Sequence, residues 1–432
     1  MRSFFQCLFL FVGLSVWSSQ TVGQVPTPAP AQDHSILIYN ATAHIGTGRV
    51  IETAAIAMDS GRIVRVYDLL VEAIDTNDFK EVIDATGKHV YPGFILTNNV
   101  LGLTEIGAVR ASHDFQETGK YNPFLRTLTS YNTDSKIIPT VRSNGILITQ
   151  VTPRGGVLSG TSSVVHLDAW NWEDAVVRAD DGVHLNWPRQ LRPHASTKKE
   201  SHTKETEALD KFFREAQAYA KAKAPVYPDA RLEALRGVFE GTQTLYIHAN
   251  KAKEILKALQ FARNFELKKI VLVGGHDAWL LTDQLKDQNV PVILRRVHSL
   301  PMRRDEPTDL PFQLPALLYE AGVEFALAYE GDMEAMGSRN LPFLAGTTVA
   351  YGLPKEEAIK SITLSPAKIL GIADRVGSLE AGKDATLFIS EGDALDMQSN
   401  AVVRAFIQGR SIDLNNHQQE LYEKFKGKYG QE

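Results

Sequence analysis

The sequence has almost no cysteine: Cys7 is the single one among 432 residues, and it lies within an apolar N-terminal segment. A chain with one cysteine cannot form a disulfide within itself, and if the N-terminal segment that holds Cys7 is removed, no thiolate is left for a metal site. Any metal would therefore be held by imidazole, carboxylate or other nitrogen and oxygen donors.

An excess of positive charge is also missing. The chain carries 46 Lys and Arg against 51 Asp and Glu, a formal net charge of −5, and its basic residues form no long run. Nucleic acids and anionic membrane surfaces bind through concentrated positive charge, so neither is expected as a partner. With 44% hydrophobic and 22% charged residues, the composition is that of a globular protein with a large core.

Residues 1–23 have the organisation of a secretory signal peptide. Arg2 supplies a positive charge, Phe4–Val16 is almost unbroken apolar sequence, and small residues follow up to Gly23. The apolar run is too short to span a bilayer comfortably, so cleavage after Gly23 is expected, with an uncleaved anchor as the alternative. A Pro- and Ala-rich linker, 24–34, follows. We therefore expect an exported protein, periplasmic or secreted, without membrane attachment after cleavage.

Two patterns of secondary structure divide the rest of the chain. Residues 35–91 are expected to form short β-strands, with a hairpin around Asp59-Ser60-Gly61, and β-strands return between 376 and 412. From 92 to 375, short apolar strands alternate with amphipathic helices, which is typical of parallel βαβ units. Roughly eight such units can close into a barrel.

The sequence therefore predicts an α/β chain in which a (β/α)8 TIM-like barrel, 92–375, is inserted into a small β-sandwich. Both chain ends build that sandwich, through residues 35–91 and 376–412. Residues 413–432 are polar and are expected to form a C-terminal tail, as a surface helix or a frayed end. Barrel strand four has no clear match, and we expect it between Pro188 and Gly241.

Three stretches of sequence carry a resemblance to a known family. They are IDATGKHVYPGFI at 83–95, NLPFLAG at 340–346 with AYGL at 350–353, and AIKSITLSPAKILG at 358–371 with GSLEAGKDA at 377–385. In these stretches the chain resembles the amidohydrolase superfamily, and within it the imidazolonepropionase-like branch. The resemblance covers most of the chain and implies a barrel with its site at the carboxyl ends of the strands. Fold alone does not give function, so the site residues have to be considered one by one.

The resemblance implies a metal site that this sequence only partly retains. Members of the superfamily hold one or two divalent metals through a His-x-His pair after strand one and further ligands on strands four, five, six and eight. By matching, Asn98 and Val100 occupy the positions of the His-x-His pair. His248 and His276 keep the histidines of strands five and six. These two imidazoles are the predicted ligands of one divalent ion, Zn²⁺, Mn²⁺ or Fe²⁺.

The aspartate of strand eight matches Glu330, and a shift of two residues would use Asp332 instead. Either carboxylate could act as the catalytic base or acid. Arg154, Asn98, His166 and Arg295 are the predicted substrate-binding residues, because each is expected at the end of a barrel strand.

Two functions remain open from the sequence. The first is a hydrolase acting on a carbon–nitrogen bond other than a peptide bond, in a cyclic amide or related small molecule, through water activated by a metal at this reduced site. The second is a metal-free, non-catalytic homologue that binds a small molecule or a partner. A weaker third interpretation is a metal-independent enzyme that uses Glu330 or Asp332 with Arg154 and His248. A homo-oligomer is compatible with all three.

Overall fold

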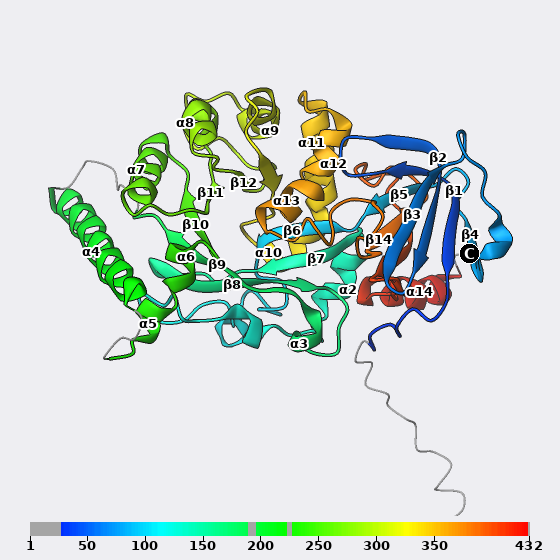
Figure 1. Cartoon of the computed structure of the whole chain (residues 1–432), viewed down its shortest axis with the longest axis horizontal. Coiled ribbons are helices and arrows are strands. Elements are labelled where there is room, and N and C mark those ends of the chain that lie inside the picture. The colour runs from blue at the N-terminus through cyan, green and yellow to red at the C-terminus, as the bar shows by residue number, and fades with distance from the viewer. Residues whose placement is uncertain (1–26, 189–195, 223–226, 431–432) are drawn as a thin grey trace, which may run out of the picture.

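The computed structural model describes residues 27–188, 196–222 and 227–430. A barrel forms the middle of the molecule, a second sheet lies at one end, and helix α4 (Ser196–Lys221) lies at the other (Figure 1). The predicted signal peptide and Cys7 lie outside the described residues. No helix in the described ranges is long and apolar enough to cross a membrane.

The second sheet is built from both chain ends, as predicted. Seven of its eight strands follow one hydrogen-bonded path in the order β16-β15-β14-β5-β1-β2-β3, and the eighth, β4, pairs with β1 beside this path. The predicted hairpin joins β2 to β3 through Ser60 and Gly61, whose φ angles of +50° and +78° are those of a tight hairpin turn. The strand bounds are β1 (Ile36–His44), β2 (Val50–Asp59), β3 (Arg62–Asp68), β4 (Glu81–Asp84), β5 (His89–Pro92), β14 (Leu387–Ser390), β15 (Val402–Ile407) and β16 (Arg410–Ser411).

The barrel sheet also contains eight strands, in the sequential order β6 to β13. A parallel bridge between Thr97 and Ala328 brings its first and last strands together, so the sheet is nearly closed. The predicted barrel is thus confirmed. Its strands are β6 (Phe94–Asn99), β7 (Ile146–Val151), β8 (Leu158–His166), β9 (Val176–Asn186), β10 (Thr244–Ala249), β11 (Ile270–Gly274), β12 (Val292–Leu294) and β13 (Phe325–Leu327).

Strand four does not lie where the sequence placed it. It is β9, which ends before Pro188, and the stretch up to Gly241 contains helices instead. The misplacement follows from β8, which runs antiparallel to both of its neighbours, β7 and β9. An antiparallel strand needs no long helical crossover, so the alternation of strands and helices that guided the prediction is interrupted here.

The helices cover the outside of the barrel and fill the connections. Helix α7 buries Ile255, Ala258, Leu259 and Ala262, spaced three or four residues apart, against the barrel. The polar C-terminal tail forms helix α14 (Figure 1). The helices are α2 (Ile137–Arg142), α3 (Trp172–Ala175), α4, α5 (Ala230–Glu233), α6 (Arg236–Glu240), α7 (Ala252–Asn264), α8 (Thr282–Asp287), α9 (Leu310–Glu320), α10 (Glu334–Gly337), α11 (Leu341–Ala350), α12 (Lys355–Lys360), α13 (Leu364–Ile369) and α14 (His417–Tyr429).

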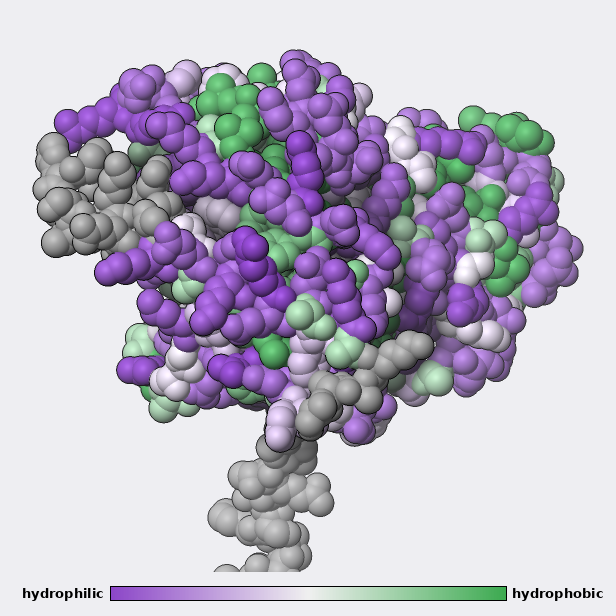
Figure 2. All heavy atoms as spheres, turned by 60° about the vertical axis from the view of Figure 1, so that its left-hand side comes forward, coloured by the Kyte–Doolittle hydropathy of each residue, from purple (hydrophilic) through white to green (hydrophobic). Residues whose placement is uncertain are grey.

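The long segment between β6 and β7 lies against the start of β8. Isolated bridges pair Gln116 with Arg154, Tyr121 with Leu158, and Arg126 with Thr161. The segment therefore adds an irregular edge to the barrel wall instead of hanging free. Hydrophilic side chains cover most of the outer face drawn in Figure 2, and apolar ones gather there only in small patches.

Candidate functional site

The side chains inside the barrel change from apolar to polar along the barrel axis. A buried apolar cluster that includes Ile95, Ile148, Val273 and Ile293 fills the interior. Beyond it, towards the carboxyl ends of the parallel strands, the side chains are charged or polar. They include Asn98 and Gln150 from β6 and β7, His184 from β9, His248 from β10, and Arg154, Arg295, Glu330 and Glu334 from the segments that follow β7, β12 and β13. This end is where barrel enzymes carry their active sites.

Arg154 connects the first barrel strand to helix α10, which follows the last strand. Its guanidinium donates to the side-chain oxygen and the carbonyl oxygen of Asn98, at 3.1 and 2.8 Å, and to Glu334 Oε1 at 2.5 Å. Asn98 is fully buried with a left-handed φ of +49°, and its backbone N–H donates to the side-chain oxygen of Gln150. The structure thus brings two predicted substrate-binding residues, Arg154 and Asn98, into direct contact.

Glu334 is a site residue that the sequence interpretation missed. It begins α10, and its side chain is only 12% exposed. Burial raises its carboxyl pKa to about 7; nearby Glu330 adds to this rise, and Arg154 opposes it. A carboxyl group with that pKa can both accept and release a proton near neutral pH. Glu334 lies only four residues after Glu330 in the sequence, but nothing in the sequence pattern set it apart as a buried carboxyl group.

The two predicted catalytic carboxylates differ in their surroundings. Glu330 Oε1 lies 2.8 Å from a guanidinium nitrogen of Arg295, and its side chain is 21% exposed. Asp332, in contrast, is exposed in the loop after β13. The structure therefore places Glu330 and Arg295 together at the barrel mouth and leaves Asp332 at the surface.

His248 is paired with a second histidine that the sequence interpretation did not consider. His184 Nδ1 lies 2.9 Å from His248 Nε2, and the ring of His184 stacks on Tyr246. Burial holds the pKa of His248 at about 3, with Arg154 and Arg295 lowering it further. The pKa of His184 is also well below its usual value, first through burial. Both rings are therefore neutral at pH 7, and one donates to the other.

His276 has a different set of partners. Its Nε2 lies 3.0 Å from Glu306 Oε2, and Arg303 pairs with both Glu306 and neighbouring Asp277. His276, Asp277 and Glu306 offer ligand atoms that lie within 4.8 Å of one another, a group found among the described residues that could hold a cation. His248 is not part of this group.

The predicted metal pair, His248 and His276, is consequently not assembled as one ligand set. Each imidazole directs Nε2 to another partner. Val100, at a metal-ligand position, is buried in the apolar core. The other two matched positions are Asn98, which accepts hydrogen bonds from Arg154, and Glu330, which is paired with Arg295. Two guanidinium groups repel a divalent cation, so these residues do not fit the metal centre that the resemblance implies.

The prediction that His166 reaches the same cavity is wrong. Because β8 is antiparallel, its end lies at the opposite end of the barrel, where His166 pairs with Ile148 near the start of β7. Both ring nitrogens of His166 are buried without a hydrogen-bond partner in the described structure. Burial lowers its pKa to about 3, and Arg375 and Arg410 add to this effect. His166 is thus a neutral interior residue remote from the mouth.

A buried polar network inside the barrel holds several side chains of the site in place. Asp181, fully buried on β9, accepts hydrogen bonds from Gln150, Ser162 and Tyr246, at 2.8, 2.7 and 2.6 Å. Burial raises the pKa of Asp181 in spite of these bonds. The network fixes Gln150, which holds Asn98, and Tyr246, on which His184 stacks. A fully bonded network of this kind keeps the side chains above it in one arrangement.

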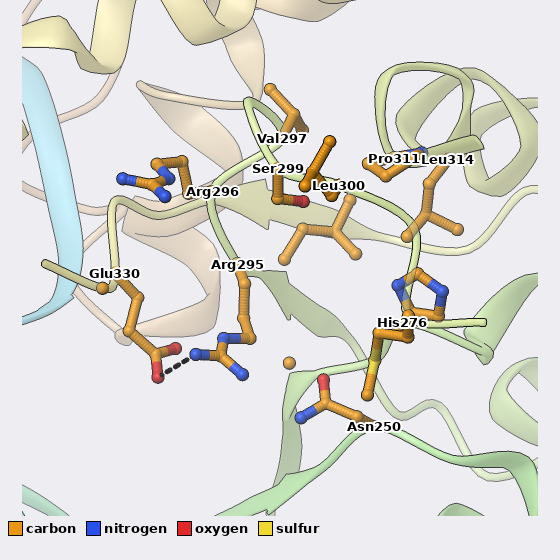
Figure 3. A pocket seen from close by; sticks show the side chains of 14 residues that line it. Asn250, His276, Arg295, Arg296, Val297, Ser299, Leu300, Pro311, Leu314 and Glu330 are labelled. Carbon is orange, nitrogen blue, oxygen red and sulfur yellow. Dashed lines mark ion pairs between the residues drawn. The ribbon is translucent and has the colours of Figure 1, made fainter. Parts of the chain in front are cut away.

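A cavity of about 250 Å³ opens beside Arg295 and Glu330 at the carboxyl ends of β10 to β13 (Figure 3). Arg295, Asn250 and His276 point into it from three directions. Apolar side chains form the rest of the lining, among them Leu294, Val297, Leu300, Met302, Pro311 and Leu314.

The chain is similar to known proteins in both sequence and fold. The amidohydrolase family matches residues 241–412. Amidohydrolase tasK of Hapsidospora irregularis is 20% identical over 408 residues, which cover 85% of this chain and 40% of that protein. The chain thus corresponds to well under half the length of this curated relative.

Among solved structures, an amidohydrolase from Thermotoga maritima MSB8 is 25% identical, with a TM-score of 0.76 over 88% of this chain and 99% of that one. Molinate hydrolase is 15% identical, with a TM-score of 0.55 over 89% of this chain and 96% of its own, and shares the fold alone. The narrower resemblance to the imidazolonepropionase-like branch stays a prediction. The family match, the curated relative and the barrel with its second sheet all show that this chain is similar to the amidohydrolase superfamily in sequence and in fold.

Proposed function

We propose that this chain hydrolyses a carbon–nitrogen bond, other than a peptide bond, in a small amide bound at the barrel mouth. We further propose that a carboxylate, and not a metal centre of the superfamily type, activates the water. The observation that carries this proposal is Glu334, a buried carboxyl group with a pKa of about 7 at the carboxyl end of the barrel. The superfamily supplies the expectation of amide chemistry.

In the proposed reaction, Glu334 accepts a proton from water while the water oxygen attacks the carbonyl carbon of the amide. His248 is engaged by His184 at Nε2, which leaves Nδ1 to donate to the carbonyl oxygen as it becomes negative. The carbon–nitrogen bond then breaks, and the nitrogen takes the proton from Glu334. The products are a carboxylic acid and an amine, and Glu334 returns to its starting state.

The second candidate is a binding protein that does not hydrolyse its ligand. The pairing of Arg154 with Glu334 and of Arg295 with Glu330 favours it, because an ion pair holds each carboxylate and weakens it as a base. In both cases the proposed partner is a small molecule. Export of the chain also stays a proposal, and determining the N-terminus of the mature protein would test it.

The deciding experiment assays chelator-treated protein against a panel of small amides and lactams. We expect turnover by the natural chain and by a Glu173→Gln control, which changes an exposed carboxylate. The Glu334→Gln variant should lose about 100-fold or more in kcat. Protein that is inert to the panel but binds a panel member supports the binding candidate. Activity that returns only with added Zn²⁺, Mn²⁺ or Fe²⁺ would overturn the carboxylate scheme.

A further inference from the structure

We propose that the cavity beside Arg295 selects amides that carry a free carboxylate and an apolar group, as an N-acyl amino acid does. This inference rests on the proposed function for the fate of the amide bond, but it concerns recognition and can be tested separately. Three features of the cavity carry it: a cation held in place, an acceptor without a donor, and an apolar wall.

The cation is Arg295. Its guanidinium is fixed from one side by Glu330, at 2.8 Å, and reaches into the cavity (Figure 3). Its side chain makes no other hydrogen bond within the described part of the chain, so further N–H groups are available. A guanidinium with free, parallel N–H groups is the side chain best suited to a carboxylate.

The charge around the cavity also favours an anion. Arg295 and Arg296 both line it, whereas Glu330 is the acidic residue in the lining and is already paired. Arg296 points away from the cavity, and its guanidinium lies over the ring of Tyr329, 5.4 Å from the centroid (Figure 3). It therefore adds positive potential without occupying space that a ligand needs.

The acceptor is Asn250, which directly follows β10. Its side-chain oxygen is buried and has no hydrogen-bond partner in the described structure. In Figure 3 this oxygen points into the space between Arg295 and His276. Gly274 makes room for it, because a Cβ at that position would lie 2.6 Å from the oxygen. An unpaired buried acceptor is costly, and the N–H of an amide would satisfy it.

The wall opposite these polar groups is apolar. Leu294, Val297 and Leu314 are buried, whereas Leu300 is 87% exposed and Met302 is 48% exposed. The two exposed side chains lose contact with water if an apolar substituent packs on them, which is a favourable change. A ligand with its carboxylate on Arg295, its N–H on Asn250 and an acyl chain on this wall uses all three features.

The test measures equilibrium binding of N-hexanoylglycine and its methyl ester to the full chain by calorimetry. The Glu334→Gln variant is used for every measurement, so that the proposed hydrolysis does not consume the acid. We expect the acid to bind about tenfold or more tightly than the ester, because the ester lacks the charge that Arg295 recognises. A further Asn250→Ala change should weaken both ligands by a similar factor.

Arg295→Gln should remove the preference for the acid, and Arg304→Gln, an exposed arginine outside the lining, should keep it. Because Arg295→Gln also leaves Glu330 unpaired, the double change Arg295→Gln, Glu330→Gln is measured beside it and should show the same loss. Equal binding of acid and ester, or no binding of the acid, overturns the inference. Tight binding of the acid without turnover by the natural chain contradicts the proposed hydrolysis and leaves this inference standing.

Discussion

The raised pKa of Glu334 makes the stability of the protein depend on pH in a definite direction. An unfolded glutamate has a pKa of 4.5, and the folded protein holds this one at about 7. Below pH 4.5 Glu334 is protonated in both the folded and the unfolded state, so its titration does not change the free energy of unfolding. As the pH rises towards 7, the unfolded chain releases the proton first, so the folded state loses stability until Glu334 itself ionises. The difference between the two pKa values corresponds to about 3 kcal/mol.

Glu334→Gln removes this titration and leaves an amide oxygen for Arg154. The free energy of unfolding of the variant, minus that of the natural chain, should therefore rise by about 3 kcal/mol between about pH 4.5 and about pH 8.5. The attraction of Arg154 for the ionised carboxylate is already contained in the pKa of about 7, so losing it adds no separate change with pH. Urea unfolding followed by tryptophan fluorescence at several pH values measures it.

The matched control is Glu173→Gln, an exposed glutamate on the first turn of α3. Its difference from the natural chain should stay flat across the same range. A flat difference for Glu334→Gln as well would mean that Glu334 ionises in the folded protein as it does in water. That result would remove the reason for treating Glu334 as an acid–base group.

Three further predictions concern the rest of the structure. Asp168→Ala should lower the free energy of unfolding by about 3–5 kcal/mol, because it leaves the buried guanidinium of Arg142 and the partly buried one of Arg410 without their carboxylate partner. Denaturant titration beside Asp174→Ala, an exposed control, measures this. Gly182→Ala should cost about 1–3 kcal/mol, since its Cβ would lie 2.3 Å from the carbonyl oxygen of Thr244, whereas Gly107→Ala, with nothing within 4 Å, should be nearly neutral. Chelator dialysis should leave the Tm unchanged and elemental analysis should find less than one metal per chain; one bound Zn²⁺, lost on His276→Ala, would contradict this.

The general architecture could be read from the sequence because it depends on patterns that act locally. Alternation of strands and helices between 92 and 375 predicted the barrel, and the return of β-strands after 376 predicted the shared second sheet. The register and the direction of individual strands could not be predicted in the same way. The polar residues Arg178, Asp180 and Asp181 interrupt the apolar pattern of β9, and the reversal of β8 is set by tertiary pairing.

The same limit explains which residues of the candidate site could be predicted from the sequence and which could not. The positions of Arg154, Asn98, Arg295, Glu330 and His248 at the carboxyl end of the barrel could be predicted because each follows or ends a strand that was placed correctly. His184 was missed with strand four, and His166 was misplaced with the direction of strand three. The pairing of Arg154 with Glu334 joins residues 180 positions apart, and a pKa near 7 arises only from that burial. A single sequence carries no signal for either.

Isolated bridges hold Gln116 against Arg154, just before β8, and hold Tyr121 and Arg126 against Leu158 and Thr161 of β8, with a consequence for how a molecule could enter the barrel. Because these bridges hold one side of the opening in place, we expect ligands to enter from the opposite side, across residues 295–309, where Leu300 is exposed. Shortening or stiffening residues 297–309, which leaves Arg295 and its ion pair with Glu330 in place, should change the rates at which ligands bind and dissociate. Entry of a ligand would then depend on residues 297–309, whereas the proposed chemistry depends on Glu334.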